Sequence, residues 1–457
     1  MKQNFVMKLL ISAGLIAAAG CTAPSFHPLS LKNELQYTQY VKEKYAADKE
    51  WWKLYQNEQL NALIEQALKN NPDYLKAAIN INKELYNLNL KTADLFPTME
   101  GSLGSSSQRQ IDRGDNFASN FSGEFGLNYE ADLYGKIRDA RSAQEFEYQA
   151  TVQDKEAARL SLVNSVVDLF FNLEYLDNSI ALSKVNVKVY QDIRNIMQNK
   201  YDNGKIDNLE VAQAKQSLLS EKNKLLELET QFREMEQSLR NILNIRPEEK
   251  LNITYANLLE QQEVKVSLDI PMSVLANRPD LAASEYRLKK VFKNLRAEQK
   301  NWYPNISLRG AVGSSSDKAR TTFDFPFPLG SASIDLPFLD WTRVKNNIKI
   351  SEADYDIALI EFKDTLNQAL NEIAYYYFAY DKSREIYANT AENYKNAVEI
   401  TSYYESRYNN GKTEFRDFLE AINTENTTKK DMLQQKYQII KYENYIYKAM
   451  AGRYTLR

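Results

Sequence analysis

Three carboxylates stand at related places after two glycines of this 457-residue sequence. Glu210 lies six residues after Gly204, and Asp417 lies six residues after Gly411, with Glu420 three residues further on. A ring of carboxylates favours cations when it faces a pore. The same spacing on a helix is more often a solvated face. The residue types alone therefore favour the solvated face.

Residues that commonly catalyse reactions or bind metals form no cluster in the sequence. His27 is the only histidine, so neither a metal site nor a catalytic dyad can be built around it. Arg278-Pro279-Asp280 is explained by a helix start, with proline in the first turn and an acid that complements the helix dipole. No glycine-rich phosphate loop is present. We therefore expect no enzymatic activity, no metal and no cofactor.

Cys21 is the only cysteine, and the residues before it predict export and lipidation. Lys2 and Lys8 supply a positive end, and residues 9–19 are an apolar run too short to span a bilayer. Ala18-Ala19-Gly20-Cys21 resembles a bacterial lipobox, with alanine where leucine is usual. We expect a signal peptide and acylation of Cys21. An ordinary signal peptide with a small-residue cleavage site is the alternative.

Composition favours long helices and argues against nucleic acid as a partner. The 58 basic and 61 acidic residues nearly cancel, so no strong field attracts a polyanion. Only 14 glycines and 11 prolines occur in the chain. Residues 98–246 and 338–457 contain no proline, which permits uninterrupted helices there.

The chain is an internal duplication, because landmarks of its first half recur 207 residues later. The corresponding pairs are Asn71-Pro72-Asp73-Tyr74 with Arg278-Pro279-Asp280-Leu281, Phe96-Pro97 with Tyr303-Pro304, Lys136-Ile137-Arg138 with Arg343-Val344-Lys345, and Tyr201-Asp202-Asn203-Gly204-Lys205 with Tyr408-Asn409-Asn410-Gly411-Lys412. A period of this length is a duplicated domain and not a short-repeat solenoid.

Each half is predicted to contain a very long helix, over residues 136–203 and 343–410. Their apolar residues recur at alternating steps of three and four, which is coiled-coil spacing. Each helix would be about 100 Å long at ~1.5 Å per residue. Gly204 and Gly411 suit the left-handed stop that ends a helix before the chain doubles back. The sequence thus predicts two antiparallel helical hairpins.

Each half also contains a segment with the period-two pattern of a strand hairpin. Every second residue from Phe121 to Leu133 is apolar or glycine, and Ile306 to Val312 repeats the pattern. Polar turns are predicted at residues 112–116 and 314–318. Four strands cannot close a transmembrane barrel, which needs about eight, so chains must share one. Two chains would supply eight strands and three would supply twelve.

The second repeat resembles the signature of the TolC family of outer membrane efflux proteins. The resemblance rests on Asn277-Arg278-Pro279-Asp280-Leu281, on Ala297, and on Tyr303-Pro304-Asn305-Ile306-Ser307-Leu308-Arg309-Gly310-Ala311-Val312-Gly313. It implies an α+β membrane protein of the lipoprotein branch that serves drug and metal efflux pumps. In that family the helical hairpins form a periplasmic α-barrel, and the four strands per chain join a twelve-stranded transmembrane β-barrel shared by a homotrimer.

The function implied by the resemblance is that of an outer membrane channel subunit, a passive conduit with a gated periplasmic end. The implied partners are a periplasmic adaptor protein, an inner membrane transporter of the proton-driven RND type, and outer membrane lipid at the acylated cysteine. Two alternatives are a conduit for type I protein secretion and a structural periplasmic coiled-coil lipoprotein. The acyl anchor argues against the first, and the amphipathic strand hairpins argue against the second.

The resemblance also assigns the gate to the two helical turns. The gate residues it implies are Asp417, Glu420, Glu210, Tyr408, Thr413 and Lys412, and the hairpin tips that contact the adaptor are Gly204, Lys205, Gly411 and Lys412. Thr413 stands where some relatives place an arginine of a closing salt bridge. Lys412 as a substitute and a different lock are both consistent with the sequence.

These expectations divide the chain into nine segments. They are a signal peptide at 1–20, a lipidated segment at 21–50, helical first parts of the repeats at 51–97 and 273–304, strand hairpins of the barrel at 98–135 and 305–342, helical hairpins of the tunnel at 136–246 and 343–457, and an equatorial connection at 247–272.

Overall fold

The computed structural model describes residues 32, 43–108, 118–264, 266–267 and 270–456. The expected signal peptide, Cys21 with its lipidation, His27 and the turn at 112–116 lie outside the described residues. The described chain forms two units, each taken by itself. One contains Lys83–Ala150 and Ser284–Phe362, and the other contains Leu31–Asn82, Thr151–Ala283 and Lys363–Arg457.

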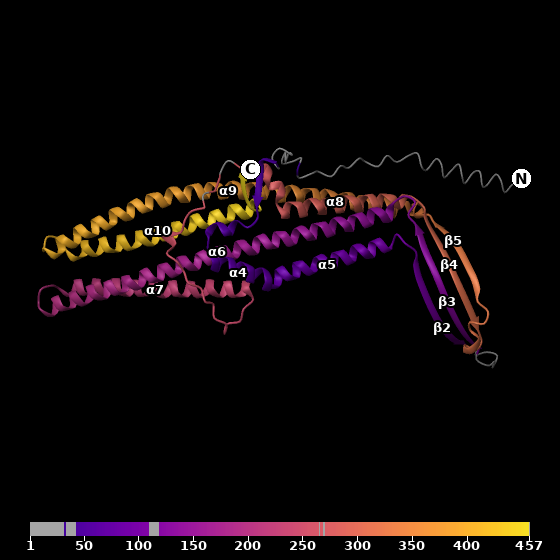
Figure 1. Ribbon diagram of the computed structural model, residues 1–457, viewed down its shortest axis with the longest axis horizontal. Helices are drawn as coiled ribbons and strands as arrows, with labels where there is room; N and C mark the ends of the chain where they lie inside the picture. The colour runs from indigo at the N-terminus through magenta and orange to yellow at the C-terminus, as the bar shows by residue number, and fades with distance from the viewer. Residues whose placement is uncertain (1–31, 33–42, 109–117, 265, 268–269, 457) are drawn as a thin grey trace. The chain divides into compact units, whose positions relative to one another are not determined.

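A four-stranded antiparallel sheet dominates the first unit (Figure 1). Its strands, in spatial order, are β2 Thr98–Gln108, β3 Ala118–Ala131, β4 Asn305–Ser316 and β5 Phe327–Asp335. The two repeats meet where β3 pairs with β4, with Phe125 opposite Val312. The sheet therefore combines one strand hairpin from each half of the duplication.

Two details of the strand prediction were wrong. β3 ends at Ala131, so Leu133, assigned to the strand, lies beyond it and is exposed. The turn expected at residues 314–318 begins later, because β4 continues to Ser316 and a short 3-10 helix, η5 Ala319–Thr321, follows. Serines 314 to 316 pair with β3. Pairing with the neighbouring strand, and not the strand propensity of serine, therefore keeps these residues in the extended conformation.

The helices follow the predicted layout in both repeats. The bounds are α5 Pro72–Ala93, α6 Lys136–Asp202, α7 Asn208–Leu243, α8 Pro279–Gln299, α9 Trp341–Asn409 and α10 Phe415–Ala449. Proline opens α5 and α8, where a missing N–H costs no helical hydrogen bond. Short 3-10 helices, η4 Lys300–Trp302 and η6 Pro337–Asp340, flank the second strand hairpin. None of the described helices combines the length and apolarity needed to cross a bilayer.

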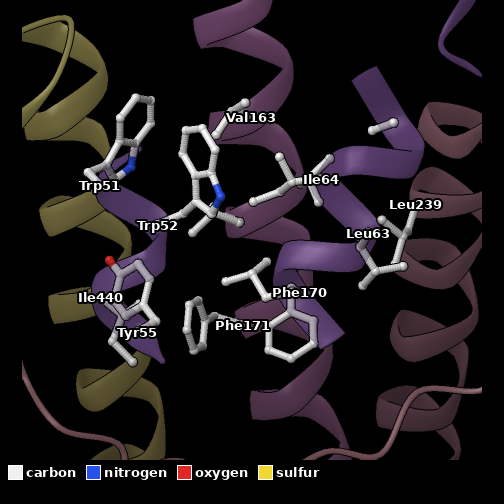
Figure 2. Packing of buried hydrophobic residues seen from close by; sticks show 14 of the residues in the cluster. Trp51, Trp52, Tyr55, Leu63, Ile64, Val163, Phe170, Phe171, Leu239 and Ile440 are labelled. Atoms are coloured by element: carbon white, nitrogen blue, oxygen red, sulfur yellow. The ribbon is translucent and has the colours of Figure 1, made fainter. Parts of the chain in front are cut away.

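The core of the second unit lies around the start of the first repeat. The 3-10 helix η1 Trp51–Tyr55 and α4 Glu58–Asn70 pack against α6, α7 and α10. Figure 2 shows the two tryptophans and Phe171 pointing into this cluster. The Trp51 indole N–H donates to Asn444 Oδ1 over 3.1 Å, which satisfies its only polar atom in the core.

A small two-stranded sheet, which the sequence did not predict, pairs residues 45–48 with residues 453–456. β1 Tyr45–Asp48 pairs antiparallel with β6 Arg453–Leu456. The expectation that residues 343–457 form a helical hairpin throughout is therefore corrected at its end. A strand of four residues is too short to show a clear period-two pattern, and its distant partner gives no local turn signal. The 247–272 connection contains η2 Leu258–Glu260, and η3 Met272–Asn277 leads into α8.

Candidate gate at the helix turns

The two helix turns have the same backbone geometry, as the duplication predicts. Gly204 and Gly411 have φ of 66° and 68°, in the left-handed region. The Gly204 N–H donates to the Tyr201 carbonyl and the Lys205 N–H donates to the Lys200 carbonyl, at 2.8 and 2.9 Å. The second turn repeats both bonds, so each helix ends in a Schellman motif. Glycine is needed for this backbone and not for space, because a Cβ at either position would meet no atom within 4 Å.

An apolar cluster joins the two hairpins just behind the turns. Its buried members come from α6, α7 and α10 and are Tyr190, Ile193, Met197, Val211, Ala214, Leu218, Phe415, Leu419 and Ile422. Tyr408 and Phe418 pack against this cluster. This packed cluster therefore fixes the helix ends that carry the expected gate residues.

Tyr408 is the residue that ties the second turn to the first hairpin. Its ring stacks on Phe418, with centroids 5.7 Å apart, and Lys200 Nζ lies 4.4 Å from its centroid. The Lys200 ammonium also donates to the Tyr408 hydroxyl over 2.7 Å. The corresponding Tyr201 of the first turn is exposed. The duplication has therefore diverged here into one anchoring and one free tyrosine ring.

Asp417 is held by its neighbours on the second hairpin. Its Oδ2 accepts a hydrogen bond of 2.8 Å from the Thr413 hydroxyl, and Arg416 Nη2 lies 3.7 Å from its Oδ1. A carboxylate in the first turn of α10 also complements the helix dipole. Thr413, at the position where some relatives have arginine, is thus a donor to the expected gate carboxylate.

The other expected site residues lie around these contacts. Glu420 is exposed, one helical turn beyond Asp417, and Glu210 is half-buried in the first turn of α7. Lys205 and Lys412 are exposed at the tips. The Lys412 carbonyl accepts a hydrogen bond from Arg407 Nη2 over 3.1 Å, which braces the second turn. Within one chain the structure brings together Tyr408 with Lys200 and Asp417 with Thr413.

Sequence reasoning missed Lys200, Arg407 and Arg416, which are cations that contact expected gate residues. A signal for Lys200 was present, because it stands four residues before Gly204, as Arg407 stands four before Gly411. Basic residues in the last turn are favoured there by the helix dipole. Only packing decides that Lys200 reaches across to the other hairpin.

Buried polar groups connect the hairpins further from the turns. Glu221 of α7 is buried and accepts a hydrogen bond of 2.6 Å from Ser183 of α6. Lys430 of α10 lies 2.8 Å from the same carboxylate. Because breaking a buried ion pair leaves an uncompensated charge, this triad fixes how α7 and α10 align.

Two buried carboxyls of the second unit have no cationic hydrogen-bond partner in the described chain. Burial raises the pKa of Glu443 to about 8, and its Oε1 accepts a 3.3 Å hydrogen bond from the Tyr380 hydroxyl. Burial, with Asp177 nearby, raises the pKa of Glu174 to about 7. Neither Glu174 oxygen has a hydrogen-bond partner among the described residues. At neutral pH burial therefore favours the protonated form of Glu443, and the pKa of Glu174 lies close to neutral pH.

Comparison with known proteins identifies the family. The model of the outer membrane efflux protein family matches residues 63–244 and again residues 270–452, so the two matches begin 207 residues apart. The toxin and drug export protein A of Aggregatibacter actinomycetemcomitans is 40% identical over 428 residues, covering 94% of this chain and 93% of that protein. The chain belongs to the outer membrane efflux protein family.

Solved structures of outer membrane channels share this family's fold with the chain. The channel CusC matches with a TM-score of 0.83 at 19% identity, over 94% of this chain and 99% of that chain. The outer membrane channel CmeC of Campylobacter jejuni matches with a TM-score of 0.81 at 24% identity, over 95% and 94%. The expected fold class is confirmed. Family membership makes the protein an outer membrane efflux component and not an enzyme.

Proposed function

We propose that the protein is the outer membrane channel subunit of a tripartite efflux system, a passive conduit that works as a homotrimer. The observation that carries the proposal is the sheet of the first unit, which has an exposed apolar face and two open edges. Among the described strands, β2 pairs only with β3 and β5 pairs only with β4. Open edges are not tolerated in lipid, so edge strands of neighbouring copies must pair. Three copies close a twelve-stranded barrel.

The long helices offer further surface for neighbouring copies. Large apolar side chains of α9 are exposed in the single chain, namely Ile350, Ile357, Ile360, Tyr375, Phe378, Ile386 and Ile400. Exposed apolar rows of this extent on a coiled-coil helix are typical of a surface that another helix covers. Hairpins of residues 136–246 and 343–457 from three copies form the periplasmic tunnel in this proposal, and Cys21 anchors each chain in lipid.

The gate lies at the helix turns in this proposal. Asp417 and Glu420 of three copies form acidic rings, with Glu210 at the matching place of the first hairpin. Tyr408, held by Lys200, closes the end from inside each chain, and Thr413 orients Asp417. The tips at Gly204, Lys205, Gly411 and Lys412 receive the adaptor, which links the channel to a proton-driven inner membrane transporter. Because the tip glycines meet no neighbouring atoms, their surfaces are open to a partner.

Single-channel recording in planar bilayers tests the conduit, with the oligomeric mass measured on the same detergent-solubilised sample. We expect a trimer with small, cation-selective and mostly closed currents. Asp417→Ala should reduce the asymmetry of current with voltage, and Lys200→Met should raise the open fraction. Lys188→Met, an exposed lysine of the same helix, is the matched control. A monomer without conductance would refute the conduit, and unchanged rectification in Asp417→Ala would refute the acidic gate.

Protein toxin export is a second candidate function, favoured by one comparison. The relative that is 40% identical over nearly the whole chain is named a toxin and drug export protein. The same conduit would then serve type I secretion as well as drug efflux. Deleting the gene and scoring both drug sensitivity and secreted protein tests the two together. Loss of drug resistance with an unchanged set of secreted proteins would leave efflux alone.

A further inference from the structure

All charged side chains of strands β2 to β5 project to one face of the four-stranded sheet. The acids are Glu100, Glu124, Glu130 and Asp335, and the base is Arg309. Pairing sets Glu100 opposite Gly126, Glu124 opposite Gly313, Glu130 opposite Ser307, Arg309 opposite Asn128 and Ser331, and Asp335 opposite Asn305. Directly opposed residues project to the same face, and alternate residues of a strand share it.

The other face of the sheet is apolar and exposed in the single chain. Its large side chains are Met99, Leu103, Phe125, Leu127, Leu308, Val312 and Ile334. Leu103 is 80% exposed, a fraction that makes sense only for a side chain with another apolar surface to contact. In a transmembrane barrel the apolar face contacts lipid and the polar face lines the lumen. Under the proposed function, the five charges therefore face the lumen.

Arg309 is the centre of this charged face. Its Nη2 lies 3.0 Å from Glu100 Oε1 and also pairs with Glu124, so it joins acids from two neighbouring strands. Gly126 makes the reach of Glu100 possible. A Cβ at Gly126 would lie 3.3 Å from Glu100 Cγ and Oε1, so the glycine lets Glu100 lie flat across β3. Arg309 is the only cation in the four strands β2 to β5.

We propose that Arg309 moderates a preference for cations that the neighbouring acids give to the barrel lumen. Four acids and one base leave a net charge of about −3 on the lumen face of each chain, and assembly repeats it around the pore. Such a lumen favours cationic solutes over anionic ones. Arg309 of β4 moderates that preference, because it pairs with Glu100 of β2 and Glu124 of β3. This inference rests on the proposed function, because the sheet must line a pore. It concerns the barrel and is independent of the carboxylates at the helix turns.

Charged thiol reagents measure the potential beside Arg309 directly. The probe is the full chain with Ser331→Cys in the outer membrane of intact cells. Ser331 is exposed and lies opposite Arg309 on the charged face. Cationic and anionic methanethiosulfonates of equal size are added outside, and the ratio of their rate constants reports the local potential. Leu308→Cys, on the apolar face, is the matched control, and the chain without an added cysteine gives the background.

We expect Ser331→Cys to react faster with the cationic reagent, while Leu308→Cys stays unreactive. Arg309→Gln should raise the cation-to-anion ratio at least about twofold, since one charge is removed within reach of the probe. Arg309→Lys should keep the parent ratio, because lysine keeps the positive charge although it lacks the forked guanidinium that joins two acids. This variant therefore distinguishes an effect of charge from a purely structural one. Glu100→Gln with Glu124→Gln should lower the ratio.

Equal ratios in the parent and in Arg309→Gln would overturn the inference about Arg309. Should Arg309→Gln fail to assemble, an unchanged ratio in the Glu100→Gln and Glu124→Gln double variant would overturn it. Labelling of Leu308→Cys in place of Ser331→Cys would instead contradict the placement of the sheet, and with it the proposed conduit. The two failures are thus distinguishable.

Discussion

Replacing Glu443 by glutamine should stabilise the protein at neutral and alkaline pH and change its stability little in acid. Glu443 is 0% exposed, its Oε1 accepts from Tyr380, and its Oε2 has no hydrogen-bond partner among the described residues. Glutamine has nearly the shape of the protonated acid. It keeps an acceptor for Tyr380 and can never carry the buried charge.

The magnitude follows from the raised pKa of Glu443, which burial moves from 4.5 to about 8. A carboxyl with a raised folded pKa contributes stability that is present below its unfolded pKa and is lost as the pH rises through its folded pKa. At about 1.36 kcal/mol per pH unit, the full loss is at most about 4 to 5 kcal/mol. About 3 kcal/mol of it falls between pH 5 and pH 8.

Thermal melting of the purified protein, followed by circular dichroism of its helices at pH 5 and pH 8, measures this effect. The stability gained by Glu443→Gln should be larger at pH 8 than at pH 5 by up to about 3 kcal/mol, or several degrees in melting temperature. Glu227→Gln, an exposed acid on α7, is the control and should shift neither curve. A gain that is the same at both pH values, or a loss at pH 8, would refute the assignment of a buried proton.

Three further predictions concern the turns and the core. Gly411→Ala should cost about 1 kcal/mol at its φ of 68°, whereas Gly330→Ala, in a strand with open space, should cost less in the same melts. Trp51→Phe removes the donor to Asn444 and should lower stability by about 1 to 3 kcal/mol, and an unchanged melt would show that bond to be dispensable. Adding back an exogenous amine should not restore the closed fraction lost in Lys200→Met, because a free amine has no tether to hold its charge over the Tyr408 ring, and single-channel recording decides it.

Local and repeated patterns were enough to predict the long helices, the two strand hairpins and their order. The 207-residue offset sets the starts of both members of three pairs: Pro72 and Pro279, Thr98 and Asn305, and Asn208 with Phe415. Proline, glycine and apolar spacing determine structure within a few residues, so the same local signals occur once in each half of the duplication. The two turn glycines and the carboxylates after them could be located from the sequence for the same reason.

Tertiary structure alone decided which side chains meet across elements. Lys200 contacts Tyr408 from another helix, and Arg309 joins acids of two neighbouring strands. Neither contact follows from spacing, because each depends on which face of one element packs against another. The pairing of β1 with β6 is the extreme case, since about 400 residues separate the two strands in the sequence. Sequence periodicity encodes the faces of elements, and only packing determines what each face touches.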